Sequence, residues 1–405
     1  MKQIVILMVG LMLAFTPQQA NAQFFKKALK VLGDVASGMV SSGTSSGSYH
    51  SPVGIDGKVR VPAIVFSNPS AVTNYTQSEG SLGLEAPDQR IQYSFYDNNS
   101  EFSTSYAGAT LSFQKNSANT NFVTLYDVST YKYDIELPST VEWKGQTWKI
   151  SVIGPQAFQS KTINSIDFPR TVYRIGYNAF LGAKLPKEFR IPSSIKKIDA
   201  HAFAECKNLT TVYIPASVMD IGYAPFYNCY DLEKIVVDEN NPYYKSVDGI
   251  LYNKEMTEII QFPCAKQMVK YTAPKTLVSV NREAFSNTLN LFTVVLPEGV
   301  QYLSVGAFSK SYIHDLYLPA TIRNIGNAAL DVNEWNDGGG HTQKTNIIVA
   351  SSSPLNAHAG AFTSFGSYFL SQPNVYVDKG TRSKYISTDP WSKLENVVEA
   401  EFIRK

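Results

Sequence analysis

Residues 43–47 match the pattern G-x-S-x-G that surrounds the nucleophilic serine of many hydrolases. In such enzymes the serine, here Ser45, lies on a sharp turn between a strand and a helix, and a histidine and an acid complete the site. Residues 37–48 consist mostly of serine and glycine, which is typical of a flexible linker. Because this context supplies neither the strand nor the helix, we do not expect Ser45 to act as a nucleophile.

The histidines form no zinc-binding pattern. None of the five stands in an H-E-x-x-H or similar spacing: His50, His201, His314, His341 and His358. His201 directly precedes an alanine and a phenylalanine that we expect to be buried. We therefore interpret His201 as a turn residue that is exposed on the outer surface.

Acidic side chains gather in two places. One group contains Asp331, Asn333, Glu334 and Asp337, and a looser group contains Asp238, Glu239 and Asp248. Their oxygen atoms suit Ca²⁺, but neither spacing matches a known calcium-binding loop. No glycine-rich phosphate loop follows a predicted strand. We predict no metal, no cofactor and no enzymatic activity.

Charge argues against further classes of function. The 405 residues include 36 lysines and arginines and 34 aspartates and glutamates, for a net charge of +2. This balance gives no electrostatic reason to expect nucleic acid, an anionic membrane or a polyanionic ligand.

Residues 1–22 have the parts of a secretory signal peptide: Lys2, an apolar run from Ile4 to Phe15, and a small-residue cleavage site at 20–22. The run is too short to span a bilayer comfortably, and no other stretch is apolar enough, so we predict no integral membrane span. No cysteine lies near the cleavage site, so a lipid anchor is not expected. We predict export to the cell surface, the periplasm or the medium.

A repeat of fixed period organises the middle of the chain. Three prolines stand 23 residues apart: Pro169, Pro192 and Pro215. A phenylalanine follows each of them after 11 residues: Phe180, Phe203 and Phe226. The same spacing returns downstream, for example from Pro274 to Phe285. Self-similarity at such a period is typical of a solenoid, so we predict that these rings stack in one interior column.

Each repeat unit combines a strand with a turn of pattern I-G-x-x-A-F. In the strand that ends at Pro215, Val212 and Ile214 point inward and Thr211 and Tyr213 point outward, by the period of two. Outward positions then form two ladders that mix charged, hydroxyl and aromatic groups, as protein-binding surfaces commonly do. The first ladder is Ser165, Glu188, Thr211, Lys234, Thr293 and Asp315. The second is Asp167, Arg190, Tyr213, Val236, Val295 and Tyr317.

An insert interrupts the period, because 59 residues separate Phe226 from Phe285. We interpret residues 238–263 as a hairpin with its turn near 253–255, which projects from the solenoid and offers a binding edge. Tyr243 and Tyr244 on this insert are candidate contacts for a protein or a sugar ring. Across the chain the candidate ligand-binding residues are Arg190, Thr211, Tyr213, Lys234, Tyr243, Tyr244, Asp315 and Tyr317.

Flanking segments complete the chain. Residues 23–54 contain a short helix and the Ser/Gly linker, and residues 55–150 are β-rich and end in a hairpin that we expect to cap the first coil. Repeats occupy 151–345, and residues 346–405 form a C-terminal cap. The three cysteines are too few for a disulfide framework. Cys206 and Cys229 occupy equivalent repeat positions and are interpreted as buried small side chains, with a bridge between them left open.

These residues resemble the BspA-like family of bacterial leucine-rich repeat proteins, which are common in exported proteins of Bacteroides and its relatives. The resemblance rests on the unit I-P-x-S-V-x-x-I-G-x-x-A-F, present at 214–226 with Pro225 in place of the alanine, and on V-D-G-I-L-Y at 247–252. It covers about residues 120–400. The resemblance implies a right-handed β-solenoid and a surface adhesin that binds host matrix proteins or other bacteria.

Together these observations predict an α/β repeat solenoid of the leucine-rich repeat type, capped at both ends, behind a β-rich N-terminal segment. A rigid extended face without a deep pocket favours an exported, non-catalytic protein-binding or adhesion module. A carbohydrate-binding module that uses exposed tyrosines, and a purely structural envelope protein, remain the alternatives.

Overall fold

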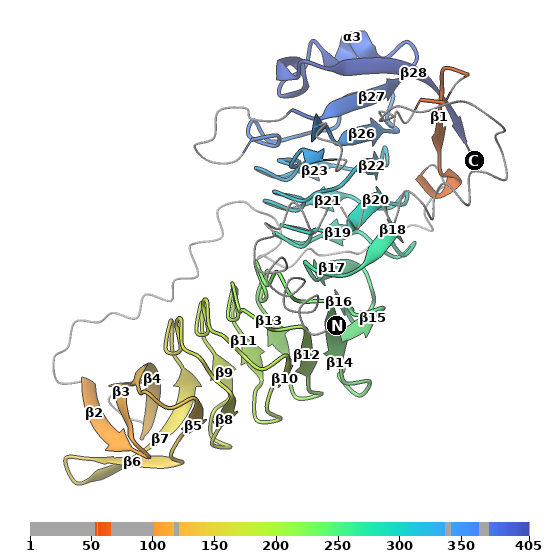
Figure 1. Cartoon of the computed structure of the whole chain (residues 1–405). Helices are drawn as coiled ribbons and strands as arrows, with labels where there is room; N and C mark the ends of the chain where they lie inside the picture. Colours follow the sequence, from red (N-terminus) through yellow and green to blue (C-terminus); the bar gives the residue numbers. More distant parts are fainter. Residues whose placement is uncertain are drawn as a thin grey trace, which may run out of the picture.

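The computed structural model describes residues 53–54, 56–65, 101–116, 121–336, 342–363 and 372–404. Within them the chain forms stacked coils of short strands, and the stack turns partway along its length (Figure 1). The predicted signal peptide, the helix at 23–36 and Ser45 lie outside the described residues. The same holds for His50, Asp337, His341 and residues 66–100 of the predicted β-rich segment.

Two ladders of parallel strands run along the solenoid. The long-strand ladder begins with β5 (Asp134–Glu136), β8 (Ser165–Asp167), β10 (Glu188–Arg190), β12 (Thr211–Ile214) and β14 (Lys234–Val237). It continues with β18 (Met268–Thr272), β20 (Leu291–Val295), β22 (Asp315–Leu318), β26 (Asn346–Val349), β27 (Asn374–Asp378) and β28 (Val397–Arg404). These strands pair in three sheets, β5–β8, β10–β12–β14 and β18–β20–β22–β26–β27–β28. Within the second sheet the pairing is in register, so that Thr211 lies beside Glu188 and Lys234, as the period predicts.

The short-strand ladder runs through the I-G turns. Its strands are β9 (Arg174–Ile175), β11 (Lys197–Ile198), β13 (Asp220–Ile221), β19 (Ser279–Val280), β21 (Tyr302–Leu303) and β23 (Asn324–Ile325). At its N-terminal end it joins β2 (Glu101–Tyr106), β3 (Ala109–Lys115), β4 (Phe122–Ser129), β6 (Thr140–Trp143) and β7 (Gln146–Ile153). The hairpin predicted at the end of residues 55–150 is formed by β6 and β7 and turns at Lys144-Gly145.

The predicted column of phenylalanine rings is confirmed. The ring centroids of Phe180 and Phe203 are 5.0 Å apart, and those of Phe203 and Phe226 are 5.5 Å apart, in stacked geometry. A second column joins Phe262, Phe285 and Phe308 at 5.1 and 4.8 Å. Cys206 and Cys229 are buried and unbridged beside the first column.

The glycine of each I-G turn allows neighbouring coils to approach closely. A Cβ on Gly222 would lie 2.2 Å from the backbone nitrogen of Ala200, and one on Gly176 would lie 2.8 Å from the Ile153 carbonyl oxygen. Neither glycine needs a positive φ, so contact between coils, not backbone freedom, selects glycine here.

The insert lies between two hydrophobic cores and does not project from the solenoid. It forms β15 (Tyr244–Val247), β16 (Ile250–Asn253) and β17 (Glu258–Gln261), an antiparallel meander whose last strand pairs in parallel with β19. Alternate residues serve opposite cores: Leu251 joins the core of the preceding repeats, and Ile250 and Tyr252 join that of the following ones. The insert therefore divides the solenoid into an N-terminal stack (residues 101–237) and a C-terminal stack (residues 258–404).

Turn residues of the two stacks meet at this division. His201 Nε2 lies 2.7 Å from Glu283 Oε2, and the guanidinium of Arg282 lies 4.4 Å over the ring of Tyr223. The His201 side chain is only 16% exposed. The expectation of an exposed His201 was wrong, because the turn of the solenoid brings a residue 82 positions away onto it.

Replacing Glu283 by alanine should loosen the junction between the stacks. Leaving a buried donor such as His201 without its hydrogen-bond partner costs about 1–3 kcal/mol. We expect a larger radius of gyration by small-angle X-ray scattering, whereas Glu283→Gln, which keeps the hydrogen bond, should preserve it. An unchanged radius of gyration in Glu283→Ala would mean that the insert alone sets the angle between the two stacks.

The ends of the chain do not divide as the sequence suggested. Residues 58–65 do not join the N-terminal cap. Instead, β1 (Lys58–Val61) pairs in parallel with β28 at the far end, and a 3-10 helix, η1 (Ala63–Val65), follows it. The C-terminal end also contains β24 (Trp335–Asn336), β25 (Thr342–Gln343), α3 (Arg382–Tyr385) and η2 (Trp391–Lys393). Tyr385 and Trp391 are fully buried there and close the second core.

Candidate functional site

The outward side of β10, β12 and β14 carries four of the predicted ligand-binding residues close together. We call this surface the open face and define it by Glu188, Arg190, Thr211, Tyr213 and Lys234. Inward residues of the same strands, such as Val212 and Ile214, are buried, which leaves alternate side chains pointing to solvent. Glu188, Arg190 and Lys234 are exposed, and Thr211 and Tyr213 are partly exposed.

Side chains of the open face organise one another. The guanidinium of Arg190 lies 3.7 Å from the ring centroid of Tyr213, its direct neighbour in register. The Tyr213 hydroxyl donates a hydrogen bond of 3.2 Å to Glu188 Oε2. The ring of Tyr213 thus positions the Arg190 cation on its face and the Glu188 carboxylate at its hydroxyl, so that both charges are presented in a fixed arrangement. Such a cluster suits recognition of a polar protein surface, where arginine and tyrosine often dominate binding.

The outward side of the C-terminal stack is covered, so Asp315 and Tyr317 do not belong to the open face. Asp315 is 5% exposed, lies 3.0 Å from His314 Nδ1, and accepts a hydrogen bond of 3.0 Å from Asn346 Nδ2. Tyr317 packs against a small third core, and burial strongly raises its pKa. The period placed both residues correctly outward, but Tyr317 packs against a core that a distant segment helps to form.

That segment, which we call the strap, comprises residues 56–65. Val59, Val61 and Val65 pack against Val295 and Ile348 and against Tyr376 and Ala400. The Glu298 backbone N–H donates a hydrogen bond of 2.8 Å to the carbonyl oxygen of Ile64. In Figure 1 the strap lies beside the C-terminal stack, next to strands that follow it by more than 200 residues in the sequence.

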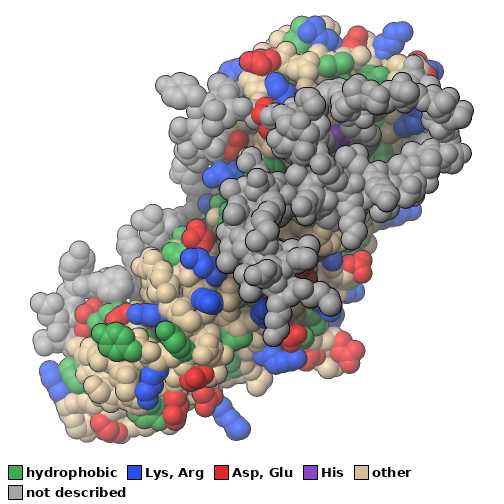
Figure 2. Space-filling model, in the orientation of Figure 1, with side chains coloured by type: hydrophobic (Ala, Val, Ile, Leu, Met, Phe, Trp, Pro, Cys, Tyr) green, Lys and Arg blue, Asp and Glu red, His purple; other side chains and the backbone are tan. Residues whose placement is uncertain are grey.

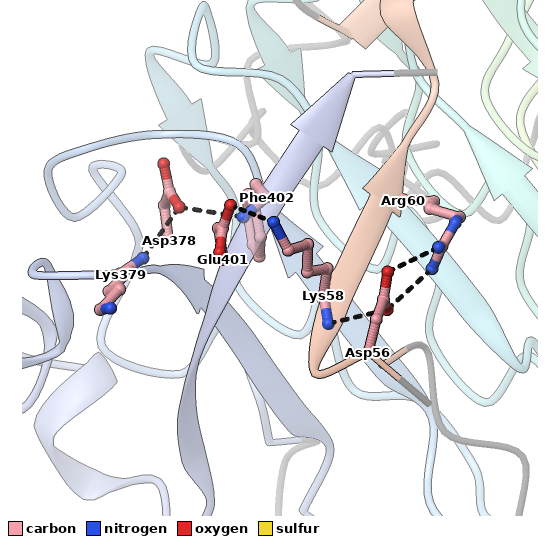
Figure 3. A network of polar contacts seen from close by, with 7 residues as sticks. All are labelled: Asp56, Lys58, Arg60, Asp378, Lys379, Glu401 and Phe402. Atoms are coloured by element: carbon pink, nitrogen blue, oxygen red, sulfur yellow. Dashed lines mark hydrogen bonds and ion pairs between the residues drawn. The ribbon is translucent and has the colours of Figure 1, made fainter. Parts of the chain in front are cut away.

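Charged side chains hold the exposed edge of the strap (Figure 3). Lys58 Nζ lies 2.7 Å from Glu401 Oε1, and Arg60 pairs with Asp56 at 2.7 Å. The Glu401 carboxylate raises the pKa of Lys58, and the Arg60 guanidinium lowers that of Asp56. Exposed ion pairs contribute little individually, so the buried valines dominate the attachment of the strap.

The two tyrosines of the insert have different environments. Tyr244 is partly buried, and its hydroxyl oxygen accepts a hydrogen bond of 2.9 Å from the Ile221 backbone N–H. Burial raises the pKa of Tyr244 to about 12. Tyr243 is 45% exposed. Only Tyr243 of this predicted pair is therefore available as a surface contact, and Tyr244 chiefly joins the insert to β13.

Residues 151–266 and 261–337 match the sequence model of the BspA type leucine rich repeat region, with six copies. The repeat region belongs to this family. The BspA-type repeats thus account for the prolines, the I-G turns and the phenylalanine columns, and the leucine-rich repeat fold predicted from the sequence is confirmed.

Several solved structures resemble the chain. A leucine-rich repeat protein from Eubacterium ventriosum is 19% identical, with 74% of this chain and 85% of that one covered, at a TM-score of 0.47. The pneumococcal vaccine antigen PcpA is 16% identical, with 75% and 98% covered, at 0.42. A leucine-rich cell surface protein from Faecalibacterium prausnitzii is 16% identical, with 75% and 95% covered, at 0.37. No curated protein matches the chain.

Around the BspA-type repeats, charges of both signs are interspersed on the face visible in Figure 2. In the described part of the chain, no group of three or more histidine, cysteine, aspartate or glutamate side chains is placed to hold a metal ion. None of the helices described there is long and apolar enough to cross a membrane.

Proposed function

We propose that this protein is an exported, non-catalytic binding module that recognises a protein partner through the open face. The observation that carries the proposal is the Arg190–Tyr213–Glu188 cluster on an uninterrupted in-register sheet. The C-terminal half of the same ladder has its outward side covered by the strap, whereas the described residues leave these side chains of the N-terminal half partly or fully exposed. The resemblance implies that the partner is a host matrix protein or a surface protein of another bacterium.

Preorganisation supports this proposal. Binding costs less when side chains already occupy the bound geometry, and the Arg190–Tyr213 stack fixes two long side chains before any partner arrives. The backbone beneath them is fixed by ladder hydrogen bonds on both sides of β12. Thr211 and Lys234 extend the polar rim of the same surface.

The double variant Arg190→Ala/Tyr213→Ala tests the open face. The protein is immobilised, exposed to host-matrix proteins and to bacterial surface extracts, and the captured partner is then measured in purified form by biolayer interferometry. We expect the dissociation constant to rise at least about thirtyfold, because central arginine and tyrosine residues commonly contribute 2 kcal/mol or more.

Arg170→Ala/Tyr173→Ala is the matched control, since Arg170 and Tyr173 are exposed but lie in the turn beyond β8. Its affinity should stay within twofold of the wild type. Equal affinity for the open-face variant and the control would remove the open face as the binding surface. A glycan array tests the carbohydrate-binding alternative, and protease access on intact cells tests export to the surface.

A further inference from the structure

A cavity of about 330 Å³ lies where the insert meets the N-terminal stack. Lys197, Asp199 and Asp220 line it from β11 and β13, and Tyr243, Tyr244 and Glu258 line it from the insert. Its lining includes no residue of the open face, so the cavity is separate from that surface.

One charged side chain in the lining of this cavity has no partner among the described residues. Lys197 forms an ion pair with Asp220, and Asp199 accepts two hydrogen bonds from Arg174 Nε at 3.0 Å and one from Arg174 Nη2 at 2.7 Å. Glu258 has no ion pair or side-chain hydrogen bond among the described residues. Glu258 is therefore the charged lining residue that these pairs leave without a partner.

Glu258 is poorly placed for stability alone. Its side chain is 8% exposed, and its buried Oε1 accepts no hydrogen bond. A buried carboxylate without a partner is unfavourable, and burial raises the pKa of Glu258 to about 7. An amide or an apolar residue would fit this position at lower cost, so the acid is better explained by a ligand.

The geometry points to a binding site for a basic side chain, a lysine or an arginine of a peptide, whose charged end pairs with Glu258. The side chains of Tyr243 and Tyr244 line the same cavity and offer apolar surface for an aliphatic stem and π-faces for a cation. Tyr223 already holds the Arg282 guanidinium at 4.4 Å, which shows that this junction accommodates a cation over a ring. The inference extends the proposed function to a second surface, and either can fail without the other.

Short peptides test the site directly on the full chain. The probes are Ac-Gly-Lys-Gly-NH₂, Ac-Gly-Arg-Gly-NH₂ and the uncharged Ac-Gly-norleucine-Gly-NH₂, with binding followed by ligand-observed NMR at pH 8. We expect saturable binding of at least one basic peptide, at least tenfold weaker binding to Glu258→Gln, and no binding of the norleucine peptide. Glu255→Gln, an exposed residue of the same insert, is the control and should bind as the wild type does.

The affinity should depend on pH in a defined direction. Above pH 7 Glu258 is mostly ionised and attracts the cation, and below pH 7 it takes up a proton and does not. We expect about tenfold weaker binding at pH 6 than at pH 8. Lys197, Asp199 and Asp220 also line the cavity and are held in ion pairs. From the other elements, Tyr243 and Tyr244 face it, with the pKa of Tyr244 raised to about 12 by burial, and the guanidinium of Arg282 lies over Tyr223.

Folding of the variant is checked by its thermal stability. Burial raises the pKa of Glu258 from its ordinary value of 4.5 to about 7 in the folded protein. The folded protein therefore loses stability as the pH rises from 4.5 to about 7. Glu258→Gln lacks this loss, so its melting temperature should exceed that of the wild type at pH 8 and match it near pH 4.5. Equal peptide binding by Glu258→Gln, binding of the norleucine peptide, no peptide binding, or Ca²⁺ binding in place of the peptides would each overturn the inference.

Discussion

Replacing Phe203 by alanine is expected to lower the free energy of unfolding by about 3–5 kcal/mol. The side chain is fully buried, and its ring stacks at 5.0 Å on Phe180 and at 5.5 Å on Phe226. It also contacts Phe189 from the strand side, at 5.7 Å. A cavity at this position removes contacts in three consecutive coils, and each coil of a solenoid is supported only by its neighbours.

Urea denaturation followed by circular dichroism measures this effect. Phe122→Ala provides the comparison, because Phe122 is 39% exposed in β4 and should cost far less. Phe203→Leu should fall between the two, since leucine refills part of the volume. If Phe203→Ala and Phe122→Ala proved equally destabilising, the stacked column would not be the main source of cohesion between coils.

The repeat could be predicted in detail because its determinants are local and periodic. The spacing of Pro192, Ile198 and Phe203 places a strand end, a short strand and an interior ring in every coil, and the structure repeats the same pairing at each step. Outward positions followed from the strand period alone. Accordingly, Arg190, Thr211, Tyr213 and Lys234 come together on the open face.

Contacts between distant segments leave no local or periodic pattern in the sequence from which they could be predicted. The alternation of Val59 and Val61 indicates a strand but does not name β28 as its partner more than 330 residues later. For the same reason the packing of Tyr317 against the third core could not be foreseen. The insert was recognised by its length, but its position between two cores depends on alternate residues facing opposite ways, which a hairpin pattern also produces.

The strongest local effect is expected from Val61→Asp in the strap. Val61 is fully buried in the third core, and an unpaired carboxylate there should cost several kcal/mol. Among the described residues, the strap meets the solenoid at the edge of β28, across one apolar face and through the Glu298–Ile64 hydrogen bond. None of these contacts involves the phenylalanine columns, so the strap should detach while the columns stay intact. Detachment would expose Val295, Ile348 and Tyr376 together with the edge of β28.

Hydrogen exchange read by mass spectrometry distinguishes detachment from global unfolding. Amides of β1 should exchange at least about a hundredfold faster in Val61→Asp, whereas those of β12 should keep wild-type rates. Binding of the dye ANS should rise as the apolar face is uncovered. Arg60→Ala on the same strand loses only an exposed ion pair and should change neither signal. Unaltered β1 exchange in Val61→Asp would mean that the strap does not depend on its buried valines, and the covered state of Tyr317 would then need another cause.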